Sequence, residues 1–529
     1  MIAISNIKLK PGEPETLLKQ KAAKALGIDP GRIESLTIRK KSLDARRKPE
    51  LWQIYTVCVT VMGNEEKLAA RCKTASVVQD TPYPIPHAEH ISERPVVIGF
   101  GPAGMFAALL LAKAGARPIV LERGQDVDAR LEAVERFRAG GALDPESNVQ
   151  FGEGGAGTFS DGKLNTHTHD KRIRWVLEQF AAHGAPEHIV YDAKPHIGTD
   201  VLVDVVRAIR EDIIAHGGEV RFGHRVTGLE ADNGALTALK VSTPEGERRI
   251  ETLHAILAIG HSARDTFRAL HAAGISMEPK PFSMGVRIEH RQTAVDTAQY
   301  GRPRGDDLPS ADYSLNCRTE HGSAYTFCMC PGGEVFAAAS ETGGVVTNGM
   351  SRSKRDGENA NAALLVTLHP EDFPGSGVFA GMEWQRAIEQ AAFRYGGGNY
   401  HAPAQLVGDF LAGQPSTGAR TVQPTYRPGV RWGDVCAVLP ERITTVLREA
   451  IPILGKKLSG FDDPDAVLTA PETRSSSPVR IDRDADCMSV SLSGLYPCGE
   501  GAGYAGGITS AAVDGLRCAE ALLHALGIE

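Results

Sequence analysis

The sequence predicts an α/β fold in which a domain of strand–helix–strand units is interrupted by a second, mixed α+β domain and preceded by a small α+β module. Three features of the 529-residue chain predict this arrangement. A strand, a glycine-rich turn and a helix follow one another in residues 95–124, and a second glycine-rich turn with a helix lies in residues 494–516. A proline-rich stretch, residues 81–87, separates both from the start of the chain.

The composition is that of a large globular protein. Of the residues, 42% are hydrophobic and 23% charged, which allows about three domains of ordinary size. The net charge of −7 argues against a protein that coats nucleic acid or an anionic membrane. The start of the chain has no signal-peptide pattern, no apolar run approaches the roughly 20 residues of a bilayer span, and nine cysteines give no disulfide framework. We therefore expect a cytoplasmic protein, and its oligomeric state stays open.

Residues 1–80 are expected to form the small module. Their apolar residues recur with the period of strands and helices in the order strand, helix, strand, strand, helix, which predicts a ferredoxin-like α+β unit. The predicted strands are residues 2–9, 33–38 and 52–61, and the predicted helices are residues 13–26 and 65–72.

A basic segment lies between the last two strands of this module. It reads RKKSLDARRK, from Arg39 to Lys48, and holds six basic residues and one acid. We expect a solvated hairpin loop, and the alternative is a contact patch for nucleic acid or another acidic partner.

The first glycine motif has the spacing of a dinucleotide site. Gly99, Gly101 and Gly104 form GxGxxG directly after a predicted strand and at the start of a predicted helix. Such glycines permit a tight turn, a close approach to pyrophosphate and close helix–strand packing, and the helix N-terminus attracts the phosphates. Glu122, at the end of the next strand, is placed to bind a ribose diol and to repel a 2′-phosphate. The predicted contacts of this Rossmann-like unit are Gly99, Gly101, Pro102, Ala103, Gly104, Glu122 and Arg123.

The end of the chain indicates which dinucleotide is bound. Residues 494–516 read GLYPCGEGAGYAGGITSAAVDGL, and this stretch resembles the second FAD signature of the glutathione reductase-like flavoprotein superfamily. The resemblance implies that an acid binds the ribityl chain and that the following helix points its N-terminus at the flavin. Here the acid is Glu500 rather than the more usual Asp. The predicted contacts are Gly499, Glu500, Gly506, Gly507, Ile508 and Thr509.

Three further segments resemble the same superfamily. ILAIGH, residues 256–261, resembles its third short signature and implies a cofactor contact at Gly260, and Val226 lies where the superfamily packs adenine. QFGEGGAGTFSDGKL, residues 150–164, follows the first unit, where a glycine loop runs along pyrophosphate and flavin, and a solvent loop is the alternative. Its predicted contacts are Gly154, Gly155, Gly157, Thr158, Lys163 and Leu164.

More narrowly, the chain resembles a largely uncharacterised bacterial FAD-dependent dehydrogenase family. The strings that carry the resemblance are FGEGGAGTFSDGKL, FSMGVRIEH, YTFCMCPGGEV, ASETGGVVTNGMS, APAQ, ETRSSSPVRI and PCGEGAGYAGG. The resemblance implies a discontinuous FAD-binding domain with an inserted substrate-side domain. We place the module at residues 1–80, the linker at 81–92, the FAD-binding domain at 93–275 and 481–529, and the inserted domain at 276–480.

The substrate-side candidates lie in the inserted domain. Arg287 and Arg474 could bind an anionic substrate, and ion pairing at a domain boundary is the alternative. Cys328 and Cys330 could form a redox pair, although their spacing is poor for a disulfide, and packing is the favoured interpretation. The sequence names no catalytic residue, and we expect no metal site.

These observations predict an FAD-dependent oxidoreductase that binds FAD non-covalently and acts on an unknown small molecule. A second GxGxxG is absent, so either NAD(P)H binds transiently as an electron donor or the substrate itself supplies the electrons. The alternative is a flavin-containing factor that binds RNA or protein through the basic segment.

Overall fold

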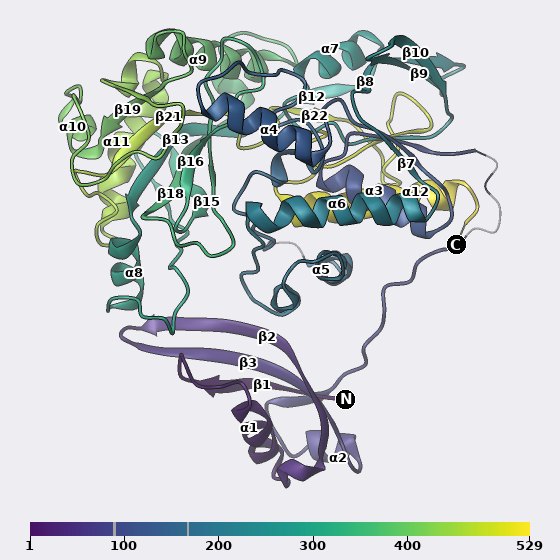
Figure 1. The fold of residues 1–529 in the computed structure, drawn as a ribbon, viewed down its shortest axis with the longest axis vertical. Helices are drawn as coiled ribbons and strands as arrows, with labels where there is room; N and C mark the ends of the chain where they lie inside the picture. The colour runs from purple at the N-terminus through teal and green to yellow at the C-terminus, as the bar shows by residue number, and fades with distance from the viewer. Residues whose placement is uncertain (88–90, 92, 167–168, 529) are drawn as a thin grey trace.

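The computed structural model describes residues 1–529 except 88–90, 92, 167–168 and 529. It shows the small N-terminal module beside a larger body of mixed helices and strands (Figure 1). Part of the predicted linker, residues 88–90 and 92, lies outside the described residues. No helix in the described part of the chain has the length and apolar character needed to cross a membrane.

The N-terminal module is a four-stranded antiparallel sheet with two helices packed against it. The strand order is β2-β3-β1-β4, so β1 and β3 form the centre. The expected order of elements is present, and one further strand, β4, is added. The elements are β1 (Ile2–Leu9), α1 (Leu17–Leu26), β2 (Ile33–Arg47), β3 (Glu50–Val61), α2 (Glu65–Ala69) and β4 (Ala75–Val77).

The basic segment is a strand rather than the loop that we expected. It forms the second half of β2, whose pairing with β3 continues past the module as a two-stranded ribbon that ends below α8 (Figure 1). The ribbon contacts the body, because the Lys41 amide donates to the Tyr191 carbonyl at 2.8 Å and Lys48 Nζ donates to the Ala298 carbonyl at 2.7 Å. Leu51, at its end, is 5% exposed and belongs to the hydrophobic core of the body. The apolar–polar alternation in the sequence covers only a few residues of the ribbon, so it did not indicate the ribbon's length.

The body contains a five-stranded parallel sheet in the order β23-β11-β5-β6-β7. Strands from both ends of the body lie side by side in it, which confirms that the Rossmann-like unit is discontinuous. Gly104 allows α3 to pack closely, since a Cβ atom there would lie 2.0 Å from the Gly99 carbonyl oxygen. The strands are β5 (Val96–Ile98), β6 (Ile119–Leu121), β7 (Glu219–Arg221), β11 (Ala255–Leu257) and β23 (Leu495–Pro497).

Helices cover this sheet, and α3 and α12 pack against each other (Figure 1). Ten residues of α3 are buried because the helix lies between the sheet and its neighbours, and its sequence accordingly has no polar face. The helices are α3 (Pro102–Lys113), α4 (Val127–Arg138), α5 (Arg172–Ala182), α6 (Thr199–Ala215), α7 (Arg264–Ala272) and α12 (Ile508–Ala525).

Two apolar runs of the sequence, residues 219–229 and 249–259, are each divided between two sheets. Residues 219–229 form β7 and then β8, with Gly223 at φ +67° between them. Residues 249–259 likewise supply the end of β10 and all of β11. Periodicity does not reveal such a change of direction. The smaller sheet has the order β10-β9-β8 and consists of β8 (Arg225–Asp232), β9 (Ala235–Thr243) and β10 (Gly246–Glu251).

The second half of the body is built on a seven-stranded mixed sheet, in the order β14-β15-β18-β13-β21-β19-β20. Two short pairs, β12 with β22 and β16 with β17, adjoin it. The strands are β12 (Met277–Pro279), β13 (Phe282–Arg291), β14 (Asn316–Arg318), β15 (Ser323–Cys330), β16 (Glu334–Ala337), β17 (Thr347–Met350), β18 (Asn359–Leu368), β19 (Ala402–Leu406), β20 (Val430–Trp432), β21 (Val467–Glu472) and β22 (Val479–Ile481). The helices are α8 (Gln292–Tyr300), α9 (Ala380–Gly396), α10 (Val407–Ala412) and α11 (Glu441–Gly455).

Candidate functional site

One large cavity lies where the parallel sheet, the glycine loop, the start of α12 and the seven-stranded sheet meet. It is partly open to solvent, and its walls include residues of the first glycine motif, of the glycine loop and of the start of α12. The carboxyl ends of β5, β6 and β11 reach it, which is where open α/β sheets bind ligands.

Most of the predicted cofactor contacts line this cavity. They come from segments more than 400 residues apart in the sequence and meet only in the folded chain. The lining residues among them are Gly99, Gly101, Pro102, Ala103, Glu122, Arg123, Gly155, Gly157, Lys163, Val226, Gly260, Glu500, Gly506, Gly507 and Ile508.

The other predicted contacts form the wall behind the lining. The Thr509 hydroxyl donates to the Leu164 carbonyl at 2.7 Å, and the Gly154 amide donates to the Phe100 carbonyl at 2.8 Å. These bonds hold the lining segments in place. The residues in this position are Gly104, Gly154, Thr158, Leu164, Gly499 and Thr509.

Two helix N-termini open onto the cavity. α3 begins after Gly101 and α12 begins after Gly507, and no side chain of the described residues caps either one. The N–H groups of a first helical turn carry partial positive charge and bind anions when no cap uses them. A pyrophosphate at α3 and an electron-rich flavin edge at α12 fit these two ends.

The glycine loop lies directly against the first glycine motif. A Cβ atom on Gly155 would lie 2.8 Å from the Gly101 Cα atom, and Gly155 has φ +58°. The loop therefore approaches α3 by bare backbone, and the alternative of a free solvent loop is wrong for its central part, because Gly155 is buried.

A residue that the sequence did not indicate holds this loop. Arg130 on α4 is fully buried and donates to four loop carbonyls at 2.5–2.9 Å. Burial lowers its pKa to about 10, against the influence of Glu122 and Glu153. An arginine on an amphipathic helix normally points to solvent, so the sequence carries no signal for this role.

Glu122 has the predicted place at the end of β6. Its carboxylate accepts the backbone N–H groups of Phe100, Gly124 and Gly152 at 2.8–2.9 Å. It therefore also joins the two loops that border the cavity. A ribose hydroxyl would add to these three bonds, since each carboxylate has about four acceptor positions.

The four substrate-side candidates differ in their surroundings. Cys328 is exposed to the cavity, whereas Cys330 is buried. Arg287 lies behind the lining residue Gly349 and donates to Glu472 at 2.9 Å. Arg474 lines the cavity, and its Nε and Nη2 atoms donate to Glu389 at 3.0 and 2.9 Å. Both arginines are therefore ion-paired, and binding of an anionic substrate by them stays a prediction.

Glu389 is the centre of a buried charge network next to the cavity. Besides the two bonds from Arg474, it accepts two from Arg264, at 2.9 and 3.0 Å. Burial alone would raise the pKa of Glu389, but Arg264 and Arg474 hold this pKa well below its usual value. Burial together with Arg474 and Arg264 also lowers the pKa of His261 to about 3, so this cavity-lining imidazole is neutral at physiological pH.

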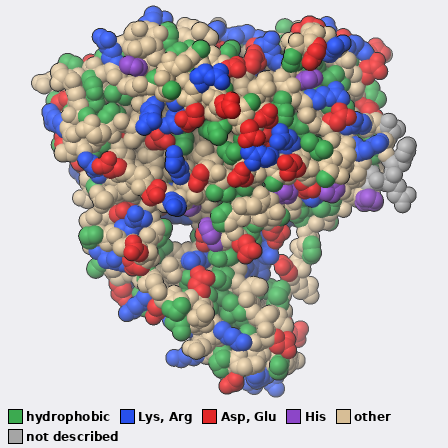
Figure 2. All heavy atoms as spheres, in the orientation of Figure 1, with side chains coloured by type: hydrophobic (Ala, Val, Ile, Leu, Met, Phe, Trp, Pro, Cys, Tyr) green, Lys and Arg blue, Asp and Glu red, His purple; other side chains and the backbone are tan. Residues whose placement is uncertain are grey.

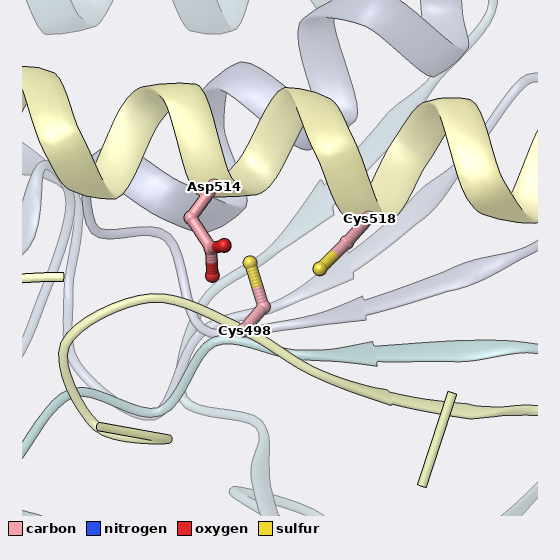
Figure 3. A group of neighbouring side chains, drawn as sticks. All are labelled: Cys498, Asp514 and Cys518. Carbon is pink, nitrogen blue, oxygen red and sulfur yellow. The ribbon is translucent and has the colours of Figure 1, made fainter. Parts of the chain in front are cut away.

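Cys498, which lines the cavity, points toward Asp514 and Cys518 of α12 (Figure 3). The Arg483 Nη1 atom donates to Asp514 at 3.0 Å and to the Cys518 sulfur at 3.3 Å. A guanidinium bound to two of the three side chains disfavours a metal ion, so we assign these residues to packing of α12 against β23.

The comparisons with known proteins agree with this geometry. Residues 94–278 match a family described as FAD binding domain, residues 281–475 match FAD-dependent protein, C-terminal domain-like, and residues 1–60 match a domain of unknown function. A Clostridium beijerinckii protein described as uncharacterized is 46% identical over 530 residues, which cover 99% of this chain and 98% of the relative.

The solved structures that resemble the chain do so weakly. The glycerol-3-phosphate dehydrogenase from Bacillus halodurans complexed with FAD is 12% identical, with 83% of this chain and 65% of the other covered and a TM-score of 0.37. The p-nitrophenol 4-monooxygenase from Pseudomonas putida is also 12% identical, with 82% and 80% covered and a TM-score of 0.37. Overlaps of this size carry no argument about activity, and membership of the glutathione reductase-like superfamily stays a prediction.

The FAD prediction is confirmed at the level of the domain. The chain belongs to the same family as its Clostridium relative, and it combines a match to an FAD-binding domain with a match to the C-terminal domain of FAD-dependent proteins.

Proposed function

We propose that this protein is an FAD-dependent oxidoreductase that acts on a small molecule. The observation that carries the proposal is the meeting of two uncapped helix N-termini and a glycine loop at one cavity that the seven-stranded sheet also lines. FAD supplies two-electron transfer when it is bound, and the protein supplies position and electrostatics.

The residues of the cavity fit an extended FAD. Val226 and Glu122 would hold the adenosine half, and the start of α3 would hold the pyrophosphate. Glu500 and the start of α12 would hold the ribityl chain and the flavin. The strand ends of the seven-stranded sheet would cover the reacting face and keep bulk water from it.

The electron donor in this proposal is NAD(P)H, which would bind transiently. Support comes from the sequence, which contains one strand-associated GxGxxG. Within the described residues nothing favours the alternative of an RNA- or protein-binding factor. On the face drawn in Figure 2, basic side chains are interspersed with acidic ones over the module and the body alike.

An anaerobic titration tests the proposed activity. Purified FAD-loaded protein would be mixed with NADH, NADPH and a metabolite library, and the flavin absorbance would be followed without nucleic acid present. Bleaching by one of these reductants supports the proposal. A flavin that only dithionite reduces, with no reoxidation by any library compound, would contradict it.

A further inference from the structure

Cys328 differs from the other cysteines of this chain. All nine are described by the structure, and the other eight are buried or half-buried. Cys328 alone is exposed, and the space it faces is the cofactor cavity. The expectation that this cysteine serves packing is therefore wrong, although it holds for Cys330.

A break in β15 turns this side chain into the cavity. The register with β18 shifts between Phe327 and Cys330, and Cys328 has φ +40°, a conformation that a residue with a side chain rarely adopts. The two cysteines would otherwise share one face of the strand, as residues at i and i+2 do.

Neighbouring side chains hold the break in place. Arg287 donates to the Cys328 carbonyl at 2.8 Å, and Lys163 donates to the next carbonyl, that of Met329. Arg287 is fixed in turn by Glu472 and by Asn348, at 2.9 and 2.8 Å. Arg287 is thus a positioning residue, and Lys163 connects the bulge to the glycine loop.

The charges around the thiol come from both walls of the cavity. The Cys328 thiol faces the cavity but is surrounded by protein, and this loss of hydration raises its pKa to about 11. Arg287 and Lys163 oppose the shift, and Glu472 and Glu500 add to it. At neutral pH the group is a thiol, and it carries a proton that it can give away.

We propose that Cys328 is the proton-transfer residue of this site and that its Sγ atom lies against the flavin. This inference rests on the proposed function. In the reductive direction a substrate double bond receives a hydride at one atom, and the hydride electrons come from the reduced cofactor, which NAD(P)H has reduced. The other atom of the bond receives the Cys328 proton, so the S–H bond breaks and an X–H bond forms. Water at the cavity mouth then returns a proton to the thiolate.

Other groups on the cavity wall are less suited to this role. His261 is neutral and sits between two arginines, and Lys163 is held by the Met329 carbonyl. Glu472 and Asp161 also line the cavity, but they are paired with Arg287 and Arg355. Burial raises the pKa of the Glu500 carboxyl to about 7, but we have assigned Glu500 to the ribityl chain.

The test is a spectral pH titration of the FAD-loaded protein from pH 7 to pH 11. A thiolate against oxidised flavin adds a charge-transfer absorbance at wavelengths beyond the blue flavin band. We expect this absorbance to rise toward pH 11 in the wild type and in the matched control Cys72→Ser. We expect none in Cys328→Ser. A yellow wild-type protein without the band would overturn the inference and leave the FAD proposal intact, whereas a protein that binds no FAD would overturn both.

A second measurement does not depend on high pH. Iodoacetamide would be added to native protein at pH 8 with and without saturating FAD, and alkylated peptides would be quantified by mass spectrometry. We expect alkylation of Cys328 to be at least tenfold slower with FAD bound than in the FAD-free protein. Equal rates at Cys328 in the two samples would mean that its thiol does not face the cofactor.

Discussion

The Cα atom of Gly101 lies 2.8 Å from the place that a Cβ atom on Gly155 would occupy. The two residues belong to separate loops, one at the start of α3 and one in the glycine loop. Their contact closes one wall of the cavity. This contact leaves no room for a side chain at Gly155. A Cβ atom on Gly101, in contrast, would make one ordinary contact, at 3.7 Å to the Gly155 Cα atom.

Gly101→Val is expected to give a folded but colourless protein. The backbone of Gly101, at φ −77° and ψ −177°, suits any residue, so the fold should persist. A valine side chain would occupy the position of the pyrophosphate and lower FAD affinity by at least about a hundredfold, or ~3 kcal/mol. Absorbance after reconstitution with FAD measures cofactor binding, and circular dichroism measures whether the variant is folded. Gly418→Val is the control, because Gly418 has no neighbour within 4 Å, and yellow Gly101→Val protein would contradict the placement.

The pH dependence of stability should reveal Glu500. Burial raises the pKa of this carboxyl from the usual 4.5 to about 7, with Lys280 opposing. The folded state then binds the proton more tightly than the unfolded state. The proton on Glu500 therefore stabilises the folded protein fully below pH 4.5, and this stabilisation is lost as the pH rises through 7. In FAD-free wild-type protein the free energy of unfolding should fall by about 3 kcal/mol between pH 5 and pH 8 for this reason, and Glu500→Gln should abolish that fall. Urea unfolding at several pH values measures it, and parallel curves for the two proteins would contradict the assignment.

Arg287→Ala should destabilise the protein strongly. It removes one partner of a buried ion pair and leaves Glu472 without compensation, which typically costs about 3–5 kcal/mol. Arg46→Ala removes an arginine whose side chain is 87% exposed and whose partner is Asp44, and it should leave the free energy of unfolding almost unchanged. Urea unfolding of both variants gives the comparison. Similar losses in the two would show that Arg287 is not buried as described.

Leu51→Ala tests the contact between the β2–β3 ribbon and the body. Leu51 packs in the same core as Tyr300 and Leu308, so its truncation should cost about 2–5 kcal/mol. Leu253→Ala is the control, since Leu253 is 54% exposed and should change the stability by less than about 0.5 kcal/mol. Thermal unfolding of the intact chain provides the readout. An unaffected Leu51→Ala protein would indicate that the ribbon does not pack on the body.

The first Rossmann-like unit and most residues that line the cavity could be predicted because local patterns determine them. The spacing of Gly99, Gly101 and Gly104 fixes a turn and a helix start that need no distant partner to be recognised. The strand before this motif and the helix after it are present as β5 and α3.

The rest depends on tertiary contacts that no local pattern records. The change of sheet at Gly223 and the length of the ribbon follow from packing. Arg130 looks like a surface arginine until α4 is placed beside the glycine loop. The alternation of β15 suggested that Cys328 and Cys330 share a face, and only the register shift at β18 separates them.

The measurement that tests the central claim most directly is the cofactor content of the native protein. After purification with saturating FAD, the absorbance spectrum and chromatography of the released cofactor would be recorded together. The account predicts a yellow protein that carries one intact FAD for each chain. A well-folded protein that stays colourless and releases no flavin would contradict it.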